Sequence, residues 1–287
     1  MTLDLTLPIF FPSITFLLRF RNTIGNILAL PRLYTLFYRQ QVFTYDEARQ
    51  ALKLKASSLQ KMLHELQRDG YVLRIKKKIY AVIPIEASGR SFAPNKYLVA
   101  GKLQTTFYLS YHTALELHGV AESAHNTTYI SVPRQSKPFQ FQGTRYSFVT
   151  RYDSYGQMIM NVDGIPLRLT DREKTILDGL ARLKYLGGLE EYLKSVSSFP
   201  SVDASRLTRY LKLAKKKGLY AKVGWLLSLF AKQWFIKQGV LDDLREHLGK
   251  RTFYLDHRKG NVRYRFDSTW NLMVPENVMD LIEETRA

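Results

Sequence analysis

The chain has 287 residues, of which 45% are hydrophobic, so it can form one large domain or two to three smaller ones with an ordinary core. Its 43 basic and 25 acidic residues give a net charge of +18, which indicates a polyanionic partner, nucleic acid first and anionic membrane second. The absence of cysteine excludes disulfides, thiolate metal sites and cysteine nucleophiles, and it is typical of a cytoplasmic protein.

An apolar run opens the chain over residues 5–18, where Pro8 and Pro12 interrupt it. A membrane-spanning helix needs ~20 apolar residues, and a secretory signal would place basic residues before the run. Asp4 is the only charge there. We therefore expect residues 1–25 to form an apolar N-terminal arm, and we expect no membrane partner.

Residues 26–85 carry the signals of a winged helix-turn-helix domain. Pro31 is expected to open a first helix that runs to Gln41. Thr44 and Glu47 have the spacing of a capping box, which predicts the start of a second helix. The residues expected to face inward from these two helices are Leu33, Leu36, Phe37, Ala48, Ala51 and Leu52.

The segment Ser57–Asp69 is predicted to be the recognition helix, joined to the second helix by a short polar turn at Lys53–Ala56. Ser57 and Gln60 have capping-box spacing, and Gly70 is expected to end the helix. Apolar residues recur at helical spacing on the buried stripe: Leu59, Met62, Leu63 and Leu66. The opposite face carries the candidate DNA-contacting residues Ser57, Ser58, Gln60, Lys61, His64 and Arg68.

Two β-prone runs, Tyr71–Ile75 and Ile79–Val82, flank three lysines and predict a hairpin with a basic tip. In a winged helix-turn-helix the second helix lies in the major groove and the wing contacts phosphate. The candidate wing contacts are Arg74, Lys76, Lys77 and Lys78. The alternative is a pair of ordinary amphipathic helices with a solvated charged face. The capped helices, the acid-poor outer face and the triple-lysine tip together favour DNA binding.

Residues 86–95 are rich in Ser, Gly and Pro and predict a linker. A larger mixed α/β domain is expected over 96–287, giving an α+β fold class for the whole chain. Within it we expect a strand-rich part over 96–169, a mainly helical part over 170–250 and a terminal hairpin over 251–275 that turns at Lys259–Asn261. The strands are expected at Thr127–Val132, Arg145–Thr150, Met158–Val162 and Gly164–Leu169.

Helices in this domain begin at recognisable caps. Ser110 is expected to cap a helix that Gly119 ends, and Thr170 and Glu173 are expected to form a third capping box. Further helices are predicted over Leu189–Val196, Ala204–Lys217, Val223–Gln238 and Leu241–Leu248.

A second basic patch is a candidate phosphate-contacting surface, because no acid occurs between Ala204 and Lys222. The alternative is a solvated charged helix face. The residues of this patch are Arg206, Arg209, Lys212, Lys215, Lys216, Lys217 and Lys222.

Motifs of enzymes are absent from the sequence: it has no P-loop, no G-x-S-x-G and no zinc-ligand spacing. His112 and Glu116 lie four residues apart, and we interpret them as a helix-surface hydrogen bond. We therefore expect no catalytic residue, no metal and no cofactor. A metal-dependent nucleic-acid enzyme targeted by the winged helix stays open as an alternative, with Asp171, Glu173 and Asp178 as its candidate carboxylates.

The order of segments resembles the AbiEi antitoxin family of bacterial and archaeal type IV toxin–antitoxin systems. The resemblance covers most of residues 30–275 and is carried by RIKKKIYAV, YLSYHTALELHGV, TTYISVP, LTDREKTILDGLARLKYLGG, RLTRYLKLAKKKGLYAKVGWLLSLF and a late WNLMV. Two features depart from the family: this wing has no glycine, and the apolar arm is not part of the pattern.

The resemblance implies a winged domain that binds operator DNA and represses its own operon. It also implies a C-terminal α/β domain that acts as antitoxin against a nucleotidyltransferase-like toxin in phage defence. The DNA contacts are then inherited by Ser57, Gln60, Lys61, His64 and the wing lysines 76–78. We therefore expect a non-enzymatic, sequence-specific regulator of transcription, with a stand-alone transcription factor as a further alternative. The sequence leaves the operator and the oligomeric state open.

Overall fold

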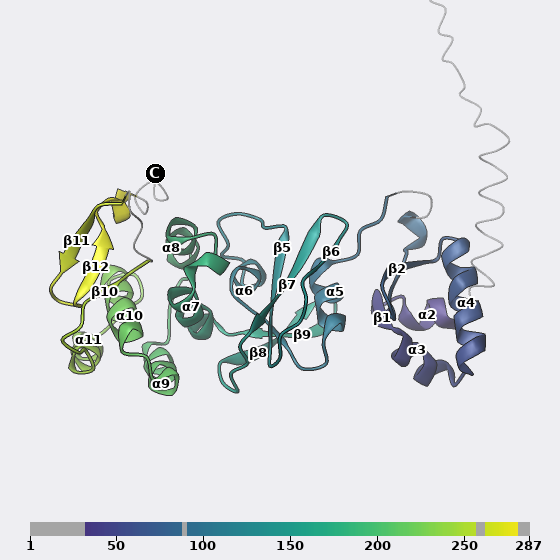
Figure 1. Ribbon diagram of the computed structural model, residues 1–287, viewed down its shortest axis with the longest axis horizontal. Coiled ribbons are helices and arrows are strands. Elements are labelled where there is room, and N and C mark those ends of the chain that lie inside the picture. Colours follow the sequence, from purple (N-terminus) through teal and green to yellow (C-terminus); the bar gives the residue numbers. More distant parts are fainter. Residues whose placement is uncertain (1–31, 88–90, 257–261, 281–287) are drawn as a thin grey trace, which may run out of the picture. The chain divides into compact units, whose positions relative to one another are not determined.

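The computed structural model describes residues 32–87, 91–256 and 262–280 (Figure 1). The chain divides into two compact units, unit 1 over residues 1–92 and unit 2 over residues 93–287, and this boundary falls within the predicted linker. The predicted apolar arm lies outside the described residues. The fold is α+β: a winged helix-turn-helix unit precedes a larger mixed α/β unit.

Unit 1 has the element order of a winged helix. Its elements are α2 (Arg32–Phe37), β1 (Val42–Thr44), α3 (Tyr45–Leu52), α4 (Ala56–Arg68), β2 (Val72–Lys76), β3 (Ile79–Val82) and the 3-10 turn η1 (Ile85–Ala87). β3 is the central strand, and it pairs antiparallel with both β1 and β2. The predicted wing is therefore present. The sequence analysis missed β1, a strand of only three residues.

The core of unit 1 contains the predicted stripe of α4, with Leu59, Leu63 and Leu66 all buried. Phe37 and Phe43 stack with ring centroids 4.5 Å apart, which joins α2 to β1. Two predictions for the first helices were wrong. α2 ends at Phe37 and not at Gln41, and the side chains of Leu36 and Ala51 are exposed. Tyr34, which was not predicted to face inward, is buried together with Leu33 and Phe37.

The start of α3 confirms its predicted capping box. The Glu47 backbone N–H donates to Thr44 Oγ1 at 3.2 Å, and the Thr44 backbone N–H donates to Glu47 Oε2 at 2.7 Å. α4 begins differently from the prediction. It starts at Ala56 with Lys55 as its N-cap residue, and no described side chain caps it. Ser57 therefore lies inside the first turn, where its hydroxyl is exposed.

The end of α4 confirms the role of Gly70, which has a φ of 78°. Its N–H donates to Gln67 O at 3.2 Å, and the Tyr71 N–H donates to Leu66 O at 2.9 Å. These two bonds make a Schellman motif, which a left-handed residue such as glycine permits. The recognition helix therefore has a sharply defined C-terminal end from which the chain turns into the wing.

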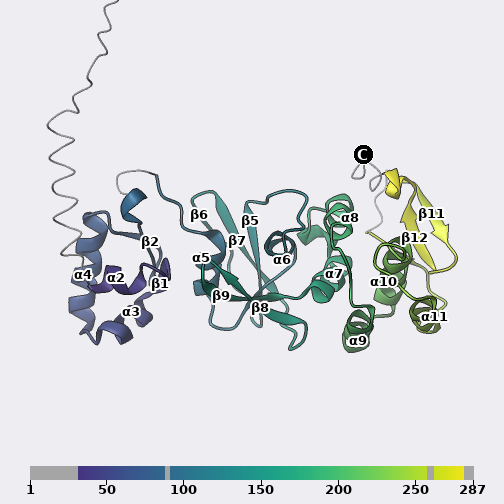
Figure 2. The same ribbon diagram turned by 180° about the vertical axis from the view of Figure 1, so that it is seen from behind.

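Unit 2 is built on a six-stranded mixed sheet with strand order β6-β7-β5-β4-β9-β8 (Figures 1 and 2). β5 and β7 are parallel, and so are β4 and β9. The bounds are β4 (Tyr108–Leu109), β5 (Thr127–Val132), β6 (Phe139–Phe141), β7 (Thr144–Thr150), β8 (Gln157–Val162) and β9 (Ile165–Thr170). The four predicted strands are confirmed as β5, β7, β8 and β9. The short strands β4 and β6 were missed.

Two helices, α5 (Lys96–Leu103) and α6 (His112–Leu117), contact this sheet. α5 was not predicted. Ser110 does not cap α6 as predicted, because its hydroxyl is buried against the hydroxyl of Ser131 at 2.8 Å. Tyr111, with a φ of 56°, is the N-cap residue.

The helical part of unit 2 consists of α7 (Arg172–Ala181), the 3-10 turn η2 (Leu183–Tyr185), α8 (Leu189–Ser197), α9 (Ala204–Ala214), α10 (Lys217–Leu229) and α11 (Gln238–Glu246). α7 is capped by Asp171, whose Oδ1 accepts from the Lys174 N–H at 2.8 Å, and not by the predicted Thr170–Glu173 box. α9 ends at Ala214, three residues before its predicted end at Lys217, and the left-handed residue Lys215 is its C-cap. α10 starts six residues earlier than predicted, at Lys217, and ends nine residues earlier than predicted, at Leu229.

The chain closes with a three-stranded sheet of β10 (Phe253–Tyr254), β11 (Tyr264–Asp267) and β12 (Leu272–Pro275), followed by the 3-10 turn η3 (Glu276–Val278). β11 and β12 form an antiparallel hairpin, whereas β10 is parallel to β12. The prediction of one hairpin over residues 251–275 was therefore wrong for its first strand. Its predicted turn at Lys259–Asn261 lies outside the described residues.

Trp270 packs this three-stranded sheet against α10. Its indole is 1% exposed and donates through Nε1 to Ser228 Oγ at 3.1 Å. The ring lies against Gly224, where any side chain would overlap it. Within the described ranges, no helix has the length and apolarity that crossing a bilayer requires.

Candidate nucleic-acid interface

The predicted DNA-contacting residues of α4 all lie on its exposed face. Gln60, Lys61 and His64 are exposed, as are Ser57 and Ser58 in the first turn. This follows from helical geometry, because Leu59, Leu63 and Leu66 occupy the opposite stripe. Arg68 is also exposed, but its guanidinium lies 2.9 Å from Asp69 Oδ1. Arg68 therefore starts from an ion pair that a phosphate would have to replace.

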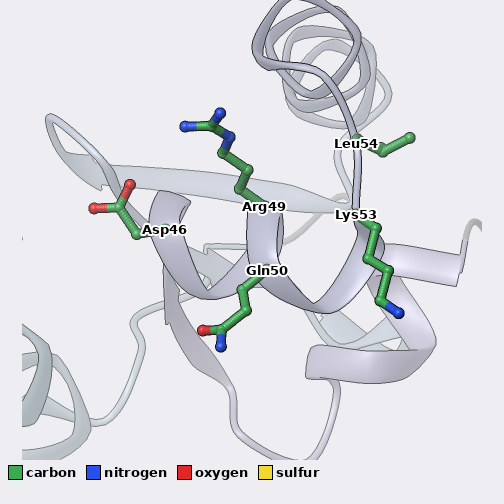
Figure 3. Close-up of a pocket in the computed structure, with 5 residues that line it drawn as sticks. All are labelled: Asp46, Arg49, Gln50, Lys53 and Leu54. Carbon is green, nitrogen blue, oxygen red and sulfur yellow. The ribbon is translucent and has the colours of Figure 1, made fainter.

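Three further basic residues lie in the helix-turn-helix, and the sequence analysis missed them. Arg49 is exposed on α3, and Lys53 and Lys55 are exposed in the turn between α3 and α4. Figure 3 shows Arg49 and Lys53 projecting away from α3 in different directions around an open groove. The groove is lined by Asp46, Arg49, Gln50, Lys53 and Leu54. A helical projection of α3 with Ala48 inward would have placed Arg49 outward.

The wing turns through only two residues, Lys77 and Lys78, between β2 and β3. Lys78 takes the left-handed φ of 67° that glycine would otherwise supply. Its carbonyl accepts from the Tyr45 N–H at 2.8 Å, and its Nζ lies 3.8 Å from Asp46 Oδ2. The tip of the wing is therefore held against the start of α3, and Asp46 offsets part of the charge of Lys78.

A β-bulge in β2 sets the direction of the other wing residues. The register with β3 shifts between Arg74 and Lys76, so Ile75 is the extra residue. As a result Ile75 is buried like Val72, while Arg74 and Lys76 are both exposed. All four predicted wing residues are therefore at the surface.

Basic side chains outnumber acidic ones in the described part of unit 1. Residues 32–87 contain eleven basic and five acidic side chains. Three of the acids have local roles, since Glu47 belongs to the α3 cap, Asp69 pairs with Arg68 and Asp46 lies beside Lys78. The exposed surface of α3, α4 and the wing therefore presents a positive field suited to phosphate.

The predicted second basic patch in unit 2 loses two of its seven members. Arg206 lies 3.5 Å from Glu173, 3.6 Å from Asp203 and 3.9 Å from Asp171, so three carboxylates surround it. Lys222 is largely buried, and its Nζ donates to Leu180 O at 3.3 Å. Burial lowers the pKa of Lys222, which nearby Asp256 only partly opposes.

The remaining five residues of that patch are exposed: Arg209, Lys212, Lys215, Lys216 and Lys217. Arg209 and Lys212 line a shallow groove that also contains Asp243 of α11. The three consecutive lysines lie at the junction of α9 and α10. The stretch from Ala204 to Lys222 contains no acid in the sequence. In the folded chain, acids from other segments lie beside its basic residues, so the surface there is less positive than the sequence predicted.

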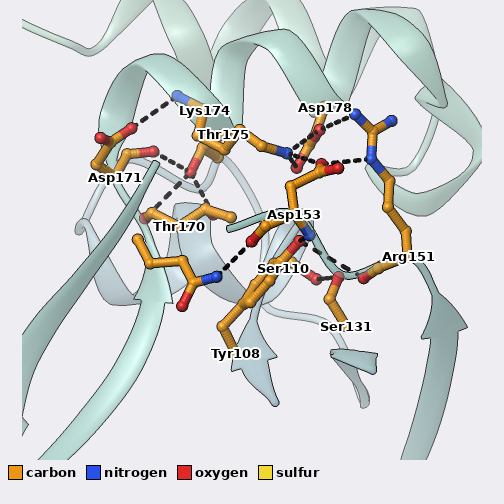
Figure 4. Close-up of polar contacts among 11 residues, drawn as sticks. Tyr108, Ser110, Ser131, Arg151, Asp153, Thr170, Asp171, Lys174, Thr175 and Asp178 are labelled. Atoms are coloured by element: carbon orange, nitrogen blue, oxygen red, sulfur yellow. Dashed lines mark hydrogen bonds and ion pairs between the residues drawn. The ribbon is translucent and has the colours of Figure 1, made fainter. Parts of the chain in front are cut away.

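The carboxylates proposed for the enzyme alternative do not form a metal cluster among the described residues. Asp178 is 1% exposed, and both of its oxygens accept from Lys174 Nζ at 2.6 Å (Figure 4). Lys174 Nζ also lies 2.8 Å from Asp153, which in turn pairs with Arg151 at 2.7 Å. Burial opposes the ionisation of Asp153, but Lys174 and Arg151 outweigh it and hold the pKa of Asp153 below its ordinary value.

The other two carboxylates also have structural partners. Asp171 caps α7 and accepts from the Tyr210 hydroxyl at 2.6 Å. Glu173 accepts from the Asp203 N–H at 2.9 Å and lies beside Arg206. These contacts join α7 to the start of α9. Each of these two acids therefore has a structural partner in this unit.

A different group of residues could hold a metal ion. Ligand atoms of His112, His125 and Glu191 all lie within 4.8 Å of one another. The interpretation of His112 as a surface residue bonded to Glu116 was wrong: His112 is fully buried, and its Nε2 lies 3.1 Å from Glu191 Oε1. Burial lowers the pKa of His112 despite the opposing hydrogen bond to Glu191.

Comparison with known proteins gives a likeness of fold. No family model matches the chain, and no curated protein matches it. Among solved structures, the crystal structure of the RV2827C protein from Mycobacterium tuberculosis is similar, with a TM-score of 0.57 and 14% sequence identity over 93% of this chain and 94% of that chain. The likeness therefore extends over both units. At this identity it supports the fold alone.

Proposed function

We propose that the chain is a sequence-specific DNA-binding regulator of transcription that reads its operator with α4 and holds phosphates with the wing and the α3–α4 turn. The observation that carries the proposal is the exposed face of α4, where Gln60, Lys61 and His64 lie outside the core on a helix whose opposite stripe is buried. Hydrogen-bonding side chains on such a face suit the base edges of the major groove. Its place of action is then the cytoplasm.

The positive field of unit 1 supports the same proposal from a different direction. Arg49, Lys53 and Lys55 flank α4, while Lys76 and Lys77 lie at the wing. Contacts from both sides of a recognition helix would fix its register on the duplex without reading sequence. The exposed lysines 215–217 of unit 2 supply a second candidate phosphate contact.

The wing provides the test of DNA binding. We expect Lys76→Ala with Lys77→Ala to weaken binding to all duplexes similarly and to flatten the slope of log Kd against log salt by about 2, since each neutralised phosphate contributes ~0.9. The measurement is fluorescence anisotropy of a labelled duplex over a range of salt concentrations. Lys232→Ala with Lys237→Ala removes the same charge from two exposed positions in unit 2 and serves as the control. Equal slopes for the wing variant and the wild type would remove the wing from the interface.

The resemblance to AbiEi antitoxins leads us to propose that the operon also encodes a nucleotidyltransferase-like toxin, which this chain neutralises through unit 2. We expect the neighbouring open reading frame alone to arrest growth and co-expression of this chain to restore it. A Gln60→Ala variant should restore growth equally well, because the operator-reading face and the antitoxin function lie in different units. A neighbour that is harmless in every condition would leave a stand-alone regulator as the better description.

A further inference from the structure

We propose that unit 2 contains a zinc site formed by His112, His125 and Glu191. The site belongs to a different unit from the DNA-binding face and joins three segments: the start of α6, the irregular chain between α6 and β5, and the first turn of α8. Two imidazole nitrogens and one carboxylate oxygen are a donor set that Zn²⁺ accepts readily, with a water molecule as fourth ligand. The inference does not depend on the proposed DNA-binding function.

The geometry around His112 Nε2 suits a shared cation. Nε2 lies 3.1 Å from Glu191 Oε1, close to the roughly 3.3 Å that separates two ligand atoms each about 2.0–2.1 Å from a tetrahedral zinc ion. In the metal-free protein this contact is a hydrogen bond in which Nε2 donates to the carboxylate. A zinc ion would take the place of that proton and keep both groups nearly where they are.

The opposite side of His112 provides the support that metal-binding histidines usually have. Nδ1 is buried and has no hydrogen-bond partner among the described residues, yet Glu116 Oε1 lies only 3.6 Å away. Binding of zinc at Nε2 would place the ring proton on Nδ1, which would then face this carboxylate. A carboxylate–histidine–zinc arrangement of this kind orients the ring and strengthens the ligand.

The two carboxylates are themselves held in position. Glu116 accepts from Lys96 Nζ at 3.0 Å and from the Tyr97 hydroxyl at 2.9 Å. Glu191 Oε2 accepts from the Ser123 hydroxyl at 3.0 Å. These bonds explain why the cluster is ordered without a metal. Glu191 Oε1 also accepts from the Ser123 N–H at 3.1 Å, and it is the oxygen that faces His112.

His125 is the residue that must move. Its ring stacks on His112 with centroids 3.5 Å apart and planes 5° from parallel, so the lone pairs of the two rings lie in parallel planes. A zinc ion needs both lone pairs to converge, and a tilt of the His125 ring would achieve this. His125 is half-buried in irregular chain, anchored through its backbone to Glu116 and Lys96, so its side chain can turn without moving the backbone.

The full-length protein, freed of metal with a chelator, provides the test. We expect one equivalent of Zn²⁺ to bind in isothermal titration calorimetry and to raise the Tm by roughly 5–10 °C at a hundredfold excess over Kd. Co²⁺ should give the visible absorption bands of a four-coordinate nitrogen and oxygen site. His125→Ala should abolish both signals and leave the Tm in chelator within about 2 °C of the wild type, because its ring lies at the edge of the core.

Two more variants make the result specific. Glu191→Gln should weaken zinc binding at least tenfold, and the Co²⁺ spectrum separates this effect from any change in stability. His247→Ala removes an exposed histidine of unit 2 and should leave both zinc binding and the zinc-induced rise in Tm unchanged. The proposal is wrong if wild-type protein binds no stoichiometric zinc, or if His125→Ala keeps the zinc-induced rise in Tm.

Discussion

Lys174→Met is expected to destabilise unit 2 by about 3–5 kcal/mol, the usual cost of leaving a buried charge without its partner. Lys174 is fully buried, and its Nζ contacts both oxygens of Asp178. Methionine preserves most of the aliphatic stem, which packs against Gly156, so the loss of charge dominates over the loss of volume. Arg151, 3.5 Å from Asp178, would be the only remaining cation at that carboxylate among the described contacts. Urea denaturation followed by circular dichroism measures the effect.

A matched variant separates this buried pair from an ordinary surface ion pair. Lys194 contacts Glu190, four residues before it, at 3.0 Å, and this acid is exposed, whereas Asp178 follows Lys174 by four residues and is buried. Lys194→Met should therefore cost less than about 1 kcal/mol. Adding Asp178→Leu to Lys174→Met should recover much of the loss, because it removes the stranded charge while Arg151 keeps Asp153 as a partner. If the double variant were less stable than Lys174→Met, charge burial would not be the cause.

Gln60→Ala and Lys61→Ala are each expected to weaken binding to the preferred DNA site by about 1–3 kcal/mol, the contribution of a side chain that reads a base edge. The preferred site is first selected from a random duplex library with the wild-type protein. The affinities of each variant for that site and for an unrelated duplex are then compared at one salt concentration. Both side chains are exposed on α4, so neither change should alter folding.

The comparison of the two duplexes decides the role of each residue. A base-reading residue loses affinity mainly on the preferred site, whereas a phosphate contact loses it on both duplexes. Gln238→Ala and Lys232→Ala are the matched controls, since both residues are exposed in unit 2. Equal losses on the two duplexes would make Gln60 and Lys61 backbone contacts, and specificity would have to come from another part of the interface.

Local sequence patterns were sufficient for the helix-turn-helix of unit 1 and for the longer strands of unit 2. The apolar stripe of α4, the capping box at Thr44 and the left-handed Gly70 each act within a few residues of chain, so spacing alone predicts them. The exposure of Gln60, Lys61 and His64 follows from the same periodicity. The candidate DNA-contacting face could therefore largely be predicted from the sequence. Arg49 was missed because the outward face of α3 was not assigned from its helical periodicity.

Features that depend on competition between neighbouring elements were predicted less well. Ser57 has good capping-box spacing, yet α4 starts one residue earlier, where the Tyr45 hydroxyl donates to Ala56 O at 3.1 Å. In the same way Asp171, and not Thr170, caps α7, because Thr170 is hydrogen-bonded to Thr175 inside the core. The N-cap residue of α4 is Lys55, whose side chain makes no cap hydrogen bond, so the packing around the first turn set the start of this helix and not the best capping side chain.

Sites assembled from distant segments could be recognised only in the folded chain. Lys222 was predicted to be part of a basic surface, but it is half-buried on the closely packed helix α10 and donates to Leu180 O. His112 and Glu191 are 79 residues apart and meet because α8 packs beside α6. Helical and strand periodicity determine which face of one element is buried, since they act over a few residues. The burial of a charge, or the convergence of ligands, depends on which elements become neighbours, and that is a property of the sheet order and helix packing.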